Sequence, residues 1–162
     1  MQIRSARPED ADAIWAILGP VIRAGETYAL ERDMARDDAL AYWMNAEKMT
    51  FVAEENGQIL GTYYLRANQP RYSGGGHVCN CGYVVSARAA GQGVGRRMCR
   101  HSLEQARARG YKAMQFNLVV STNEPAVKLW QSCGFQTIGR LPGAFMHPVK
   151  GYVDGLVMFQ QL

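Results

Sequence analysis

Three glycines within five residues separate a strand-like segment from a helical one in this chain. The cluster is Ala90-Gly91-Gln92-Gly93-Val94-Gly95. It follows the apolar run from His77 to Val85, and it opens a segment of helical periodicity, Gly95 to Arg109. Glycines let a backbone approach a ligand closely, and the free N–H groups and dipole of a helix N-terminus attract an anion. The unit therefore predicts a sheet with helices packed on it, and an anion-binding loop between strand and helix.

Two common glycine-rich phosphate loops do not match this cluster. The phosphate-binding loop of NTPases ends in Gly-Lys-Ser/Thr, whereas Gly95 is followed by Arg96-Arg97. The dinucleotide-binding fingerprint needs a glycine at position 96 and an acidic residue about 20 residues further on, and no acidic residue lies between Glu104 and Glu124. The interpretation that remains is a pyrophosphate held by successive backbone N–H groups of residues 91 to 96.

Hydrophobic periodicity predicts the element order β, α, α, three strands, α, β, α, β, β, which is a mixed sheet with helices packed on it. The strongest short signal is Asn56-Gly57, a hairpin turn between two strand-like runs. The polar, glycine-rich segment Asn68 to Gly76 is predicted to be a mobile loop. The predicted strands are Gln2 to Ser5, Phe51 to Glu54, Gln58 to Arg66, His77 to Val85, Lys112 to Ser121, Gln136 to Arg140 and Tyr152 to Gln161. The predicted helices begin at Pro8, span Met34 to Asn45 and Gly95 to Arg109, and begin again at Thr122.

Two local expectations go beyond the element order. Gly19-Pro20 is expected to kink or stop the first helix near its middle, because proline lacks the N–H that the helical ladder needs. The strand from Lys112 to Ser121 is expected to alternate strictly between its two faces. One face then carries Met114, Phe116, Leu118 and Val120, and the other carries Gln115 and Asn117.

The composition is that of a folded domain, and 162 residues predict a single domain, 1–162. With 48% hydrophobic and 20% charged residues, disorder, collagen-like sequence and coiled coil are excluded. There is no apolar run long enough for a membrane span or for the middle of a signal peptide. The 4 cysteines are too few for a disulfide scaffold. We therefore expect a cytoplasmic location and no membrane partner.

Basic residues are concentrated around and after the glycine cluster. Residues 1 to 60 carry an excess of acidic side chains, whereas residues 88 to 112 carry seven basic side chains against Glu104 alone. Such a stripe attracts nucleic acid or a small polyanionic cofactor. A solvated helix face would explain Arg107 and Arg109, but Arg96 and Arg97 lie directly against the glycines. Because no groove of basic and aromatic residues accompanies the stripe, the cofactor is favoured over nucleic acid.

Two motifs at this point resemble the GNAT acetyltransferase superfamily. Its signature Gln/Arg-x-x-Gly-x-Gly/Ala, between a strand and a helix, falls on Ala90 to Gly95, with alanine at the first position. A second element, Asn-x-x-Ala-x-x-x-Tyr-x-x-x-Gly-Phe, has the same register as the segment from Asn123 to Phe135, with Trp130 at the tyrosine position. The resemblance implies an α/β (α+β) fold. Its sheet is mixed, mostly antiparallel and twisted, with about six or seven strands flanked by about four helices, and the strands splay apart at the cofactor site.

The resemblance also implies the chemistry. Such enzymes pass acetyl directly from acetyl-CoA to an amine, through an intermediate whose oxyanion needs hydrogen-bond donors. Orientation in a ternary complex supplies most of the rate. Such enzymes are often dimers, so a homodimer is also an expectation here. Transferred by position, Tyr83, Val84 and Val85 offer backbone groups to pantetheine, Asn123 contacts the pantetheine arm, and Gly91, Gln92, Gly93, Val94, Gly95 and Arg96 hold the pyrophosphate.

A narrower resemblance concerns the acceptor. The stretches His77 to Val85, Phe116 to Asn123 and Ile138-Gly-Arg140 look like the yeast-type proline-analogue N-acetyltransferases, which acetylate azetidine-2-carboxylate and related cyclic amino acids. In that family two strand asparagines engage the substrate, and they fall on Asn80 and Asn117. An asparagine is not a base, but it can orient an amine and donate to an oxyanion. The alternative is that these two residues only satisfy backbone groups at a bulge. The acceptor loop of the superfamily corresponds to Gly25-Glu26-Thr27-Tyr28.

Two other functions stay open at this point. A non-catalytic acetyl-CoA-binding module is motivated by Ala90, by Trp130 and by the missing carboxylate on the strand that ends at Val85. Nucleic-acid binding is motivated by the basic stripe. A metal site is not expected. Cys79 and Cys81 share a strand face, but zinc would need two more ligands, and Cys99 and Cys133 lack paired spacing. His77 and His147 flank loops that could reach an acceptor, and Asp154 is either part of a structural turn or a contact to the substrate amine.

Overall fold

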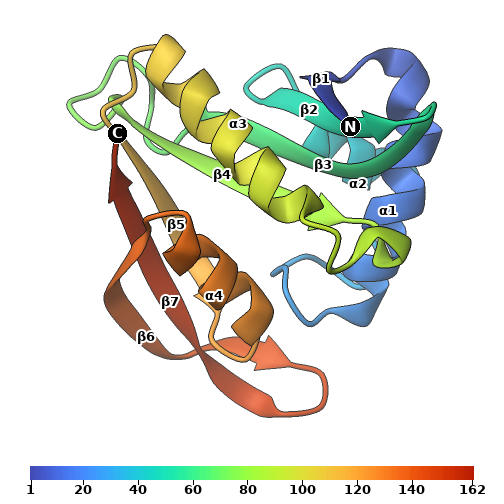
Figure 1. The fold of residues 1–162 in the computed structure, drawn as a ribbon. Coiled ribbons are helices and arrows are strands. Elements are labelled where there is room, and N and C mark those ends of the chain that lie inside the picture. The colour runs from blue at the N-terminus through green and yellow to red at the C-terminus, as the bar shows by residue number, and fades with distance from the viewer.

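Seven strands form one sheet in the order β1-β2-β3-β4-β5-β7-β6, with four α-helices packed on it (Figure 1). The structure is a computed structural model that describes residues 1–162. The strands are β1 (Gln2–Ser5), β2 (Met49–Glu55), β3 (Gln58–Ala67), β4 (Val78–Val85), β5 (Ala113–Val120), β6 (Gln136–His147) and β7 (Gly151–Gln161). The helices are α1 (Ala11–Ala24), α2 (Arg36–Trp43), α3 (Val94–Ala108) and α4 (Glu124–Ser132), with 3-10 turns at Pro8–Asp10 and Ala87–Ala89. This confirms the predicted fold class and element order.

One strand pair determines where a ligand can enter the sheet. All neighbouring strands are antiparallel except β4 and β5, which run parallel. This pair is joined only at Val78 opposite Ala113 and at Cys79 opposite Met114, near the start of both strands. Beyond that point the two strands separate, as their divergence in Figure 1 shows. The predicted splay is therefore present between β4 and β5.

The sheet is covered on both faces, and each face has its own core. On one face α1 and α2 pack against Val52, Tyr64 and Val84. On the other face α3 and α4 pack against a larger cluster that includes Met114 and Phe116. The alternation along β4 assigns its even residues to the α1–α2 side and Cys79, Cys81 and Tyr83 to the α3–α4 side. None of the helices combines the length and apolar character that crossing a bilayer requires.

The predicted break of the first helix at Gly19-Pro20 is wrong as a stop. Helix α1 continues through Pro20 to Ala24 and ends at Gly25, which adopts φ +66°. An interior proline costs about 3 kcal/mol, and each fully buried aliphatic side chain contributes about 1.5–3 kcal/mol. The buried stripe of this helix (Ile14, Ile17, Leu18 and Ile22) therefore outweighs the loss of one hydrogen bond.

The predicted alternation along β5 fails halfway. The register with β7 shifts between Phe116 and Val119, which marks a bulge. One extra residue changes the phase, so Val119 joins Met114 and Phe116 in the core, and Leu118 is only half-buried. Asn117 lies at the bulge, is exposed and points away from that core.

Strand β6 is also longer than predicted. It continues past Arg140 and Pro142 to His147, because an irregularity between Leu141 and Phe145 absorbs the interruption.

Candidate active site

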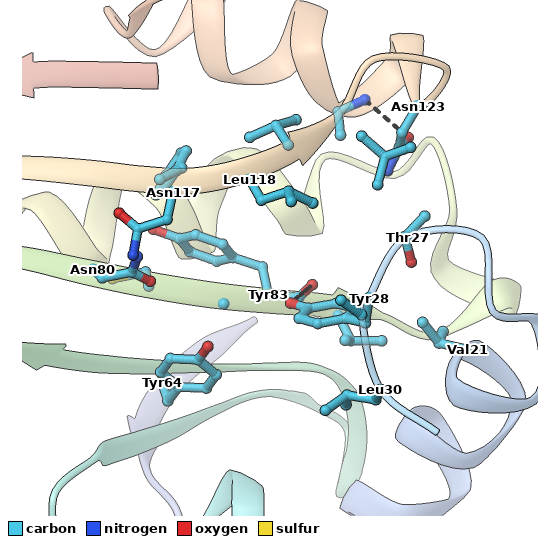
Figure 2. A pocket seen from close by; sticks show the side chains of 18 of the residues that line it. Val21, Thr27, Tyr28, Leu30, Tyr64, Asn80, Tyr83, Asn117, Leu118 and Asn123 are labelled. Atoms are coloured by element: carbon cyan, nitrogen blue, oxygen red, sulfur yellow. Dashed lines mark hydrogen bonds between the residues drawn. The ribbon is translucent and has the colours of Figure 1, made fainter. Parts of the chain in front are cut away.

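A cleft of about 400 Å³ opens where β4 and β5 separate. Its walls come from both strands, from the end of β3, from the loop that follows α1 and from the start of α4 (Figure 2). Of the residues predicted for the site, the cleft is lined by Thr27, Tyr28, Asn80, Tyr83, Val84, Val85, Asn117 and Asn123. The structure thus brings together predicted residues from four segments: the loop after α1, β4, β5 and the start of α4.

The free edge of β4 faces this cleft. The Ser86 N–H donates to the Leu60 carbonyl oxygen of β3 at 2.8 Å, so the backbone groups of every second residue before it also face β3. The backbone groups of Tyr83 and Val85 consequently point the other way, toward the gap between β4 and β5. Val84 also lines the cleft, but its backbone groups face β3. An extended ligand can pair with such an edge as an added strand does. The Tyr28 hydroxyl already donates to the Tyr83 carbonyl oxygen at 3.0 Å.

The glycine loop follows β4 and exposes a row of backbone donors. Gly91 and Gly93 adopt φ +74° and +78°, and a Cβ on either would meet no protein atom within 4 Å. Gly95 is close-packed instead, because a Cβ there would lie 3.0 Å from Leu129 Cδ2 and 3.7 Å from Val85 Cγ2. The start of α3 therefore lies against the end of β4. Backbone N–H groups that donate to no protein acceptor belong to Gly91, Gly93, Val94, Gly95 and Arg96.

Two other details distinguish members of this loop. The Gln92 side chain folds back and donates to the Arg88 carbonyl oxygen at 2.9 Å, so it is already engaged. The Arg96 side chain is exposed and forms no ion pair. The arrangement of free amides at a helix N-terminus with unpaired positive charge beside it suits a phosphate or pyrophosphate.

Three asparagines meet beside the cleft. Asn68 Oδ1 accepts from Asn117 Nδ2 at 2.8 Å and from Asn80 Nδ2 at 3.3 Å. Gln115 Nε2 in turn donates to Asn117 Oδ1 at 2.9 Å. Figure 2 shows the side chains of Asn80 and Asn117 pointing toward each other from β4 and β5. Neither amide bonds to backbone, so the alternative in which they satisfy backbone groups at the bulge is not what this structure contains.

The loop after α1 covers part of the cleft. Tyr28 packs edge-on against Trp43, with ring centroids 5.8 Å apart, and Thr27 lies beside it on the wall. Glu26 is exposed and does not line the cleft. The structure therefore brings two of the three predicted loop residues to the site.

The start and middle of α4 form another wall. Asn123 caps this helix, since its Oδ1 accepts from the Ala126 N–H at 3.4 Å. Trp130 is buried and packs on Tyr83 and Phe116, with ring centroids 4.8 and 5.2 Å away. Both residues also line the cleft, so each combines a structural contact with a position at the site.

The remaining polar candidates lie elsewhere. His147 is buried, and its Nδ1 accepts from the Val149 and Lys150 N–H groups at 3.2 Å, which closes the turn between β6 and β7. Asp154 accepts from the Gly143 N–H at 3.0 Å and from Arg140 at 2.6 Å. His77 is exposed outside the cleft. These contacts explain His147 as part of a turn and Asp154 as part of the β6–β7 strand pair.

The buried thiols are free and neutral. Burial raises the pKa of Cys79 to about 12, and it also raises the pKa of Cys81. No group of three or more His, Cys, Asp or Glu side chains is placed to hold a metal ion. The two strand cysteines share the core face predicted for them.

Two residues with amide or charged side chains at the site, Asn68 and Arg66, were not predicted from the sequence. Asn68 falls in a segment expected to be loop, but its N–H donates to the Val78 carbonyl oxygen at 2.8 Å and extends the β3–β4 pairing. Arg66 lines the cleft at the end of β3 and carries no motif that singles it out. The signal available for Asn68 was its position directly after a predicted strand.

Comparisons with known proteins agree with this site. The sequence pattern of the Acetyltransferase (GNAT) family matches residues 16–135. The chain is similar to N-acetyltransferase aca1 of Schizosaccharomyces pombe, with 28% identity over 84% of this chain and 72% of that protein. It is also similar to L-amino acid N-acyltransferase MnaT of Escherichia coli, with 27% identity over 88% of this chain and 83% of that protein. Its fold matches the solved structure of a GCN5-related N-acetyltransferase from Kribbella flavida with a TM-score of 0.94 and 41% identity, over 99% of this chain and 97% of the other.

Proposed function

The chain belongs to the GNAT acetyltransferase family and is an N-acetyltransferase, and from that premise we propose that it acetylates the amine of a small amino acid or proline analogue. Membership of an enzyme family favours catalysis over the non-catalytic module considered from the sequence. The observation that carries the proposal is the position of Asn80 and Asn117, from two splayed strands, in one cleft with the free edge of β4.

The residues present fit acetyl-CoA as the donor. The outward-facing N–H of Tyr83 and the outward-facing backbone groups of Val85 suit an amide-bearing arm such as pantetheine, and the Tyr83 carbonyl oxygen already accepts from the Tyr28 hydroxyl. The free N–H groups of residues 91 to 96, apart from the internally bonded Gln92, suit the pyrophosphate. Bound acetyl-CoA supplies the acetyl group and a thiolate leaving group. A thiol has a pKa of about 8.5, so its thiolate leaves readily. Trp130 and Phe116, whose rings pack together, give this part of the cleft an apolar wall.

The asparagine cluster supports an acceptor of amino-acid size. Because Asn68 uses one hydrogen of each partner amide, Asn80 keeps a free Oδ1 and one N–H, and Asn117 keeps one N–H. Asn80 would accept from the amine and donate to an oxygen on which negative charge develops. Asn117 would contact the acceptor throughout the reaction. The relative named an L-amino acid N-acyltransferase supports amino acids as acceptors.

Proton transfer from the acceptor amine goes through water in this proposal, because no carboxylate lines the cleft. A peptide α-amino group has a pKa of about 8, but the carboxylate of a free amino acid raises the pKa of its own amine above that value. The acceptor is therefore mostly protonated at pH 7, and forming the free amine costs about 3–4 kcal/mol for a pKa of about 9.5–10, at 1.36 kcal/mol per pKa unit. A water molecule held by Asn80 would serve as the proton relay. Glu26 could accept that proton only through a movement of its loop, because it is exposed outside the cleft.

Free-thiol release from acetyl-CoA tests the proposal directly. The full chain is incubated with acetyl-CoA alone and then with a panel of amino acids, cyclic analogues and amines without a carboxylate. We expect thiol release that depends on an amino acid and rises at least tenfold above the rate without acceptor. The acetylated amine is identified by mass spectrometry. Release that no amino acid or proline analogue stimulates would contradict the proposal.

Asn123 should show two separable effects on substitution. Asn123→Ala is expected to weaken acetyl-CoA binding, because this side chain lies on the cleft wall assigned to the pantetheine arm. It should also lower the free energy of unfolding by about 1 kcal/mol, because the cap of α4 is lost. Asn123→Ser keeps a capping oxygen on a shorter side chain, and it is the control. Calorimetric affinity for acetyl-CoA that stays at the wild-type value in both variants would remove Asn123 from the cofactor site.

A further inference from the structure

Arg66 is the only charged residue that lines the cleft. Its Nε is buried and has no hydrogen-bond partner. No carboxylate pairs with it, since every ion pair in the structure involves other residues. A guanidinium offers five N–H donors in a planar fork, and leaving it partly buried without a partner is costly. An unpaired guanidinium in a cleft is therefore suited to an anionic ligand.

The strand register places Arg66 beside the asparagine cluster. Arg66 on β3 lies opposite Asn80 on β4, so the two side chains project from the same face of the sheet. Directly opposed residues have Cβ atoms about 4.5–5.5 Å apart. Asn80 is joined through Asn68 to Asn117. The positive charge consequently adjoins the part of the cleft assigned to the acceptor, and not the glycine loop.

A second cation lies nearby and is also unpaired. The Lys48 Nζ lies 3.4 Å from the ring centroid of Tyr42 and 4.5 Å from that of Tyr64, and it donates to the Tyr42 carbonyl oxygen. Burial and, to a smaller extent, the positive charge of Arg66 lower the pKa of Lys48 to about 8, against a smaller opposing effect of Glu47. No acidic residue lies on the cleft wall to neutralise Arg66. Both tyrosine rings line the cleft.

We propose that Arg66 binds the carboxylate of the acceptor and makes the enzyme select amines that carry an adjacent anion. The inference rests on the proposed function and narrows it. In an α-amino acid the carboxylate and the amine are attached to one carbon atom, so an amine held at Asn80 has its carboxylate within reach of the opposite residue. Arg66 repels polyamines and other acceptors that are only cationic. An amide or ester of the same amino acid keeps the amine and loses the ionic contact.

The test compares each amino acid with its own primary amide. For the wild-type chain we expect kcat/KM to favour the acid by about 10- to 100-fold, as a charge-assisted hydrogen bond implies. Arg66→Gln should reduce this ratio to near one, mainly by raising the KM of the acid. Arg66→Lys should keep part of the preference, because it retains the charge without the fork. Arg71→Gln is the matched control, since Arg71 is exposed in the next loop and does not line the cleft.

Binding without turnover gives a second readout. In the presence of coenzyme A, which carries no acetyl group, calorimetry should show that Arg66→Gln loses affinity for the acid and keeps its affinity for the amide. Equal kcat/KM for acid and amide in the wild-type chain, or an unchanged ratio in Arg66→Gln, would overturn the role of Arg66. The wild-type comparison decides the matter even where a variant does not fold. Absence of acceptor-dependent thiol release for acids and amides alike would instead overturn the proposed function.

Discussion

Gly93→Asp is expected to lower the affinity for acetyl-CoA by roughly 10²- to 10⁴-fold. The substitution places a carboxylate at the open side of the loop, where no protein atom lies within 4 Å of the new Cβ. It would repel the pyrophosphate and deprive it of about two charge-assisted hydrogen bonds, each contributing about 1.5–3 kcal/mol. The repulsion and the two lost hydrogen bonds account for the expected loss of affinity, without any change in the rest of the cleft.

The measurement is stabilisation by acetyl-CoA together with calorimetric affinity. At 100 times the dissociation constant the donor should add about 2.7 kcal/mol to the free energy of unfolding of the wild-type chain. The same concentration should add at most about 0.4 kcal/mol to the free energy of unfolding of Gly93→Asp, so its melting temperature should change little. An unresponsive wild-type chain would remove the donor assignment, and a fully responsive Gly93→Asp would remove the glycine loop from it.

The hairpin glycine provides a matched control for backbone strain. Gly57 adopts φ +75°, close to the +78° of Gly93, and a Cβ there also meets nothing within 4 Å. Gly57→Asp therefore imposes the same left-handed conformation on an aspartate, at a cost of about 1–3 kcal/mol. It is exposed on the turn between β2 and β3, outside the cleft. We expect it to lower stability as Gly93→Asp does while leaving the affinity for acetyl-CoA unchanged.

Local signals were sufficient to predict most of the fold. Asn56-Gly57 specifies a tight turn, and Gly134 ends α4, so the strands and helices between such signals could be assigned. The bulge in β5 could not be assigned, because Leu118, Val119 and Val120 are all apolar and no composition change marks the phase shift. Helix α1 continues through Pro20 because its tertiary contacts outweigh a local preference.

The site was predictable only where a residue carries its own motif. The glycine loop, Asn80, Asn117 and Asn123 were found through spacing and family resemblance, and how each contributes to the reaction remains to be tested. Asn68 could not be predicted from its polar segment, because its position at the site depends on two amides that approach it from other strands. Arg66 could not be predicted for a different reason. Its significance lies in the lack of an acidic partner, which is a property of the folded arrangement and not of the sequence around it.

Asn80→Ala is expected to lower kcat by about 10²- to 10³-fold with little change in the affinity for acetyl-CoA. This is the usual cost of losing one oriented donor at a reacting centre. Asn80 is buried, projects into the cleft and keeps a free oxygen, so its deletion removes the group assigned to the amine. The binding edge of β4 is formed by backbone and should persist. Steady-state kinetics with the best acceptor, together with calorimetric affinity for acetyl-CoA, measure the two quantities separately.

Asn117→Ala should act differently from Asn80→Ala, and this difference distinguishes chemistry from loss of structure. Its amide is expected to contact the acceptor in the ground state and the transition state alike, so the substitution should mainly raise the acceptor KM. Asn68→Ala removes the oxygen that holds both amides, and as a positioning change it should produce a smaller mixture of the two effects. Folded Asn80→Ala and Asn117→Ala variants with wild-type kcat/KM would contradict the likeness to proline-analogue acetyltransferases. Membership of the acetyltransferase family would stand, because it rests on the match over residues 16–135 and not on these two side chains.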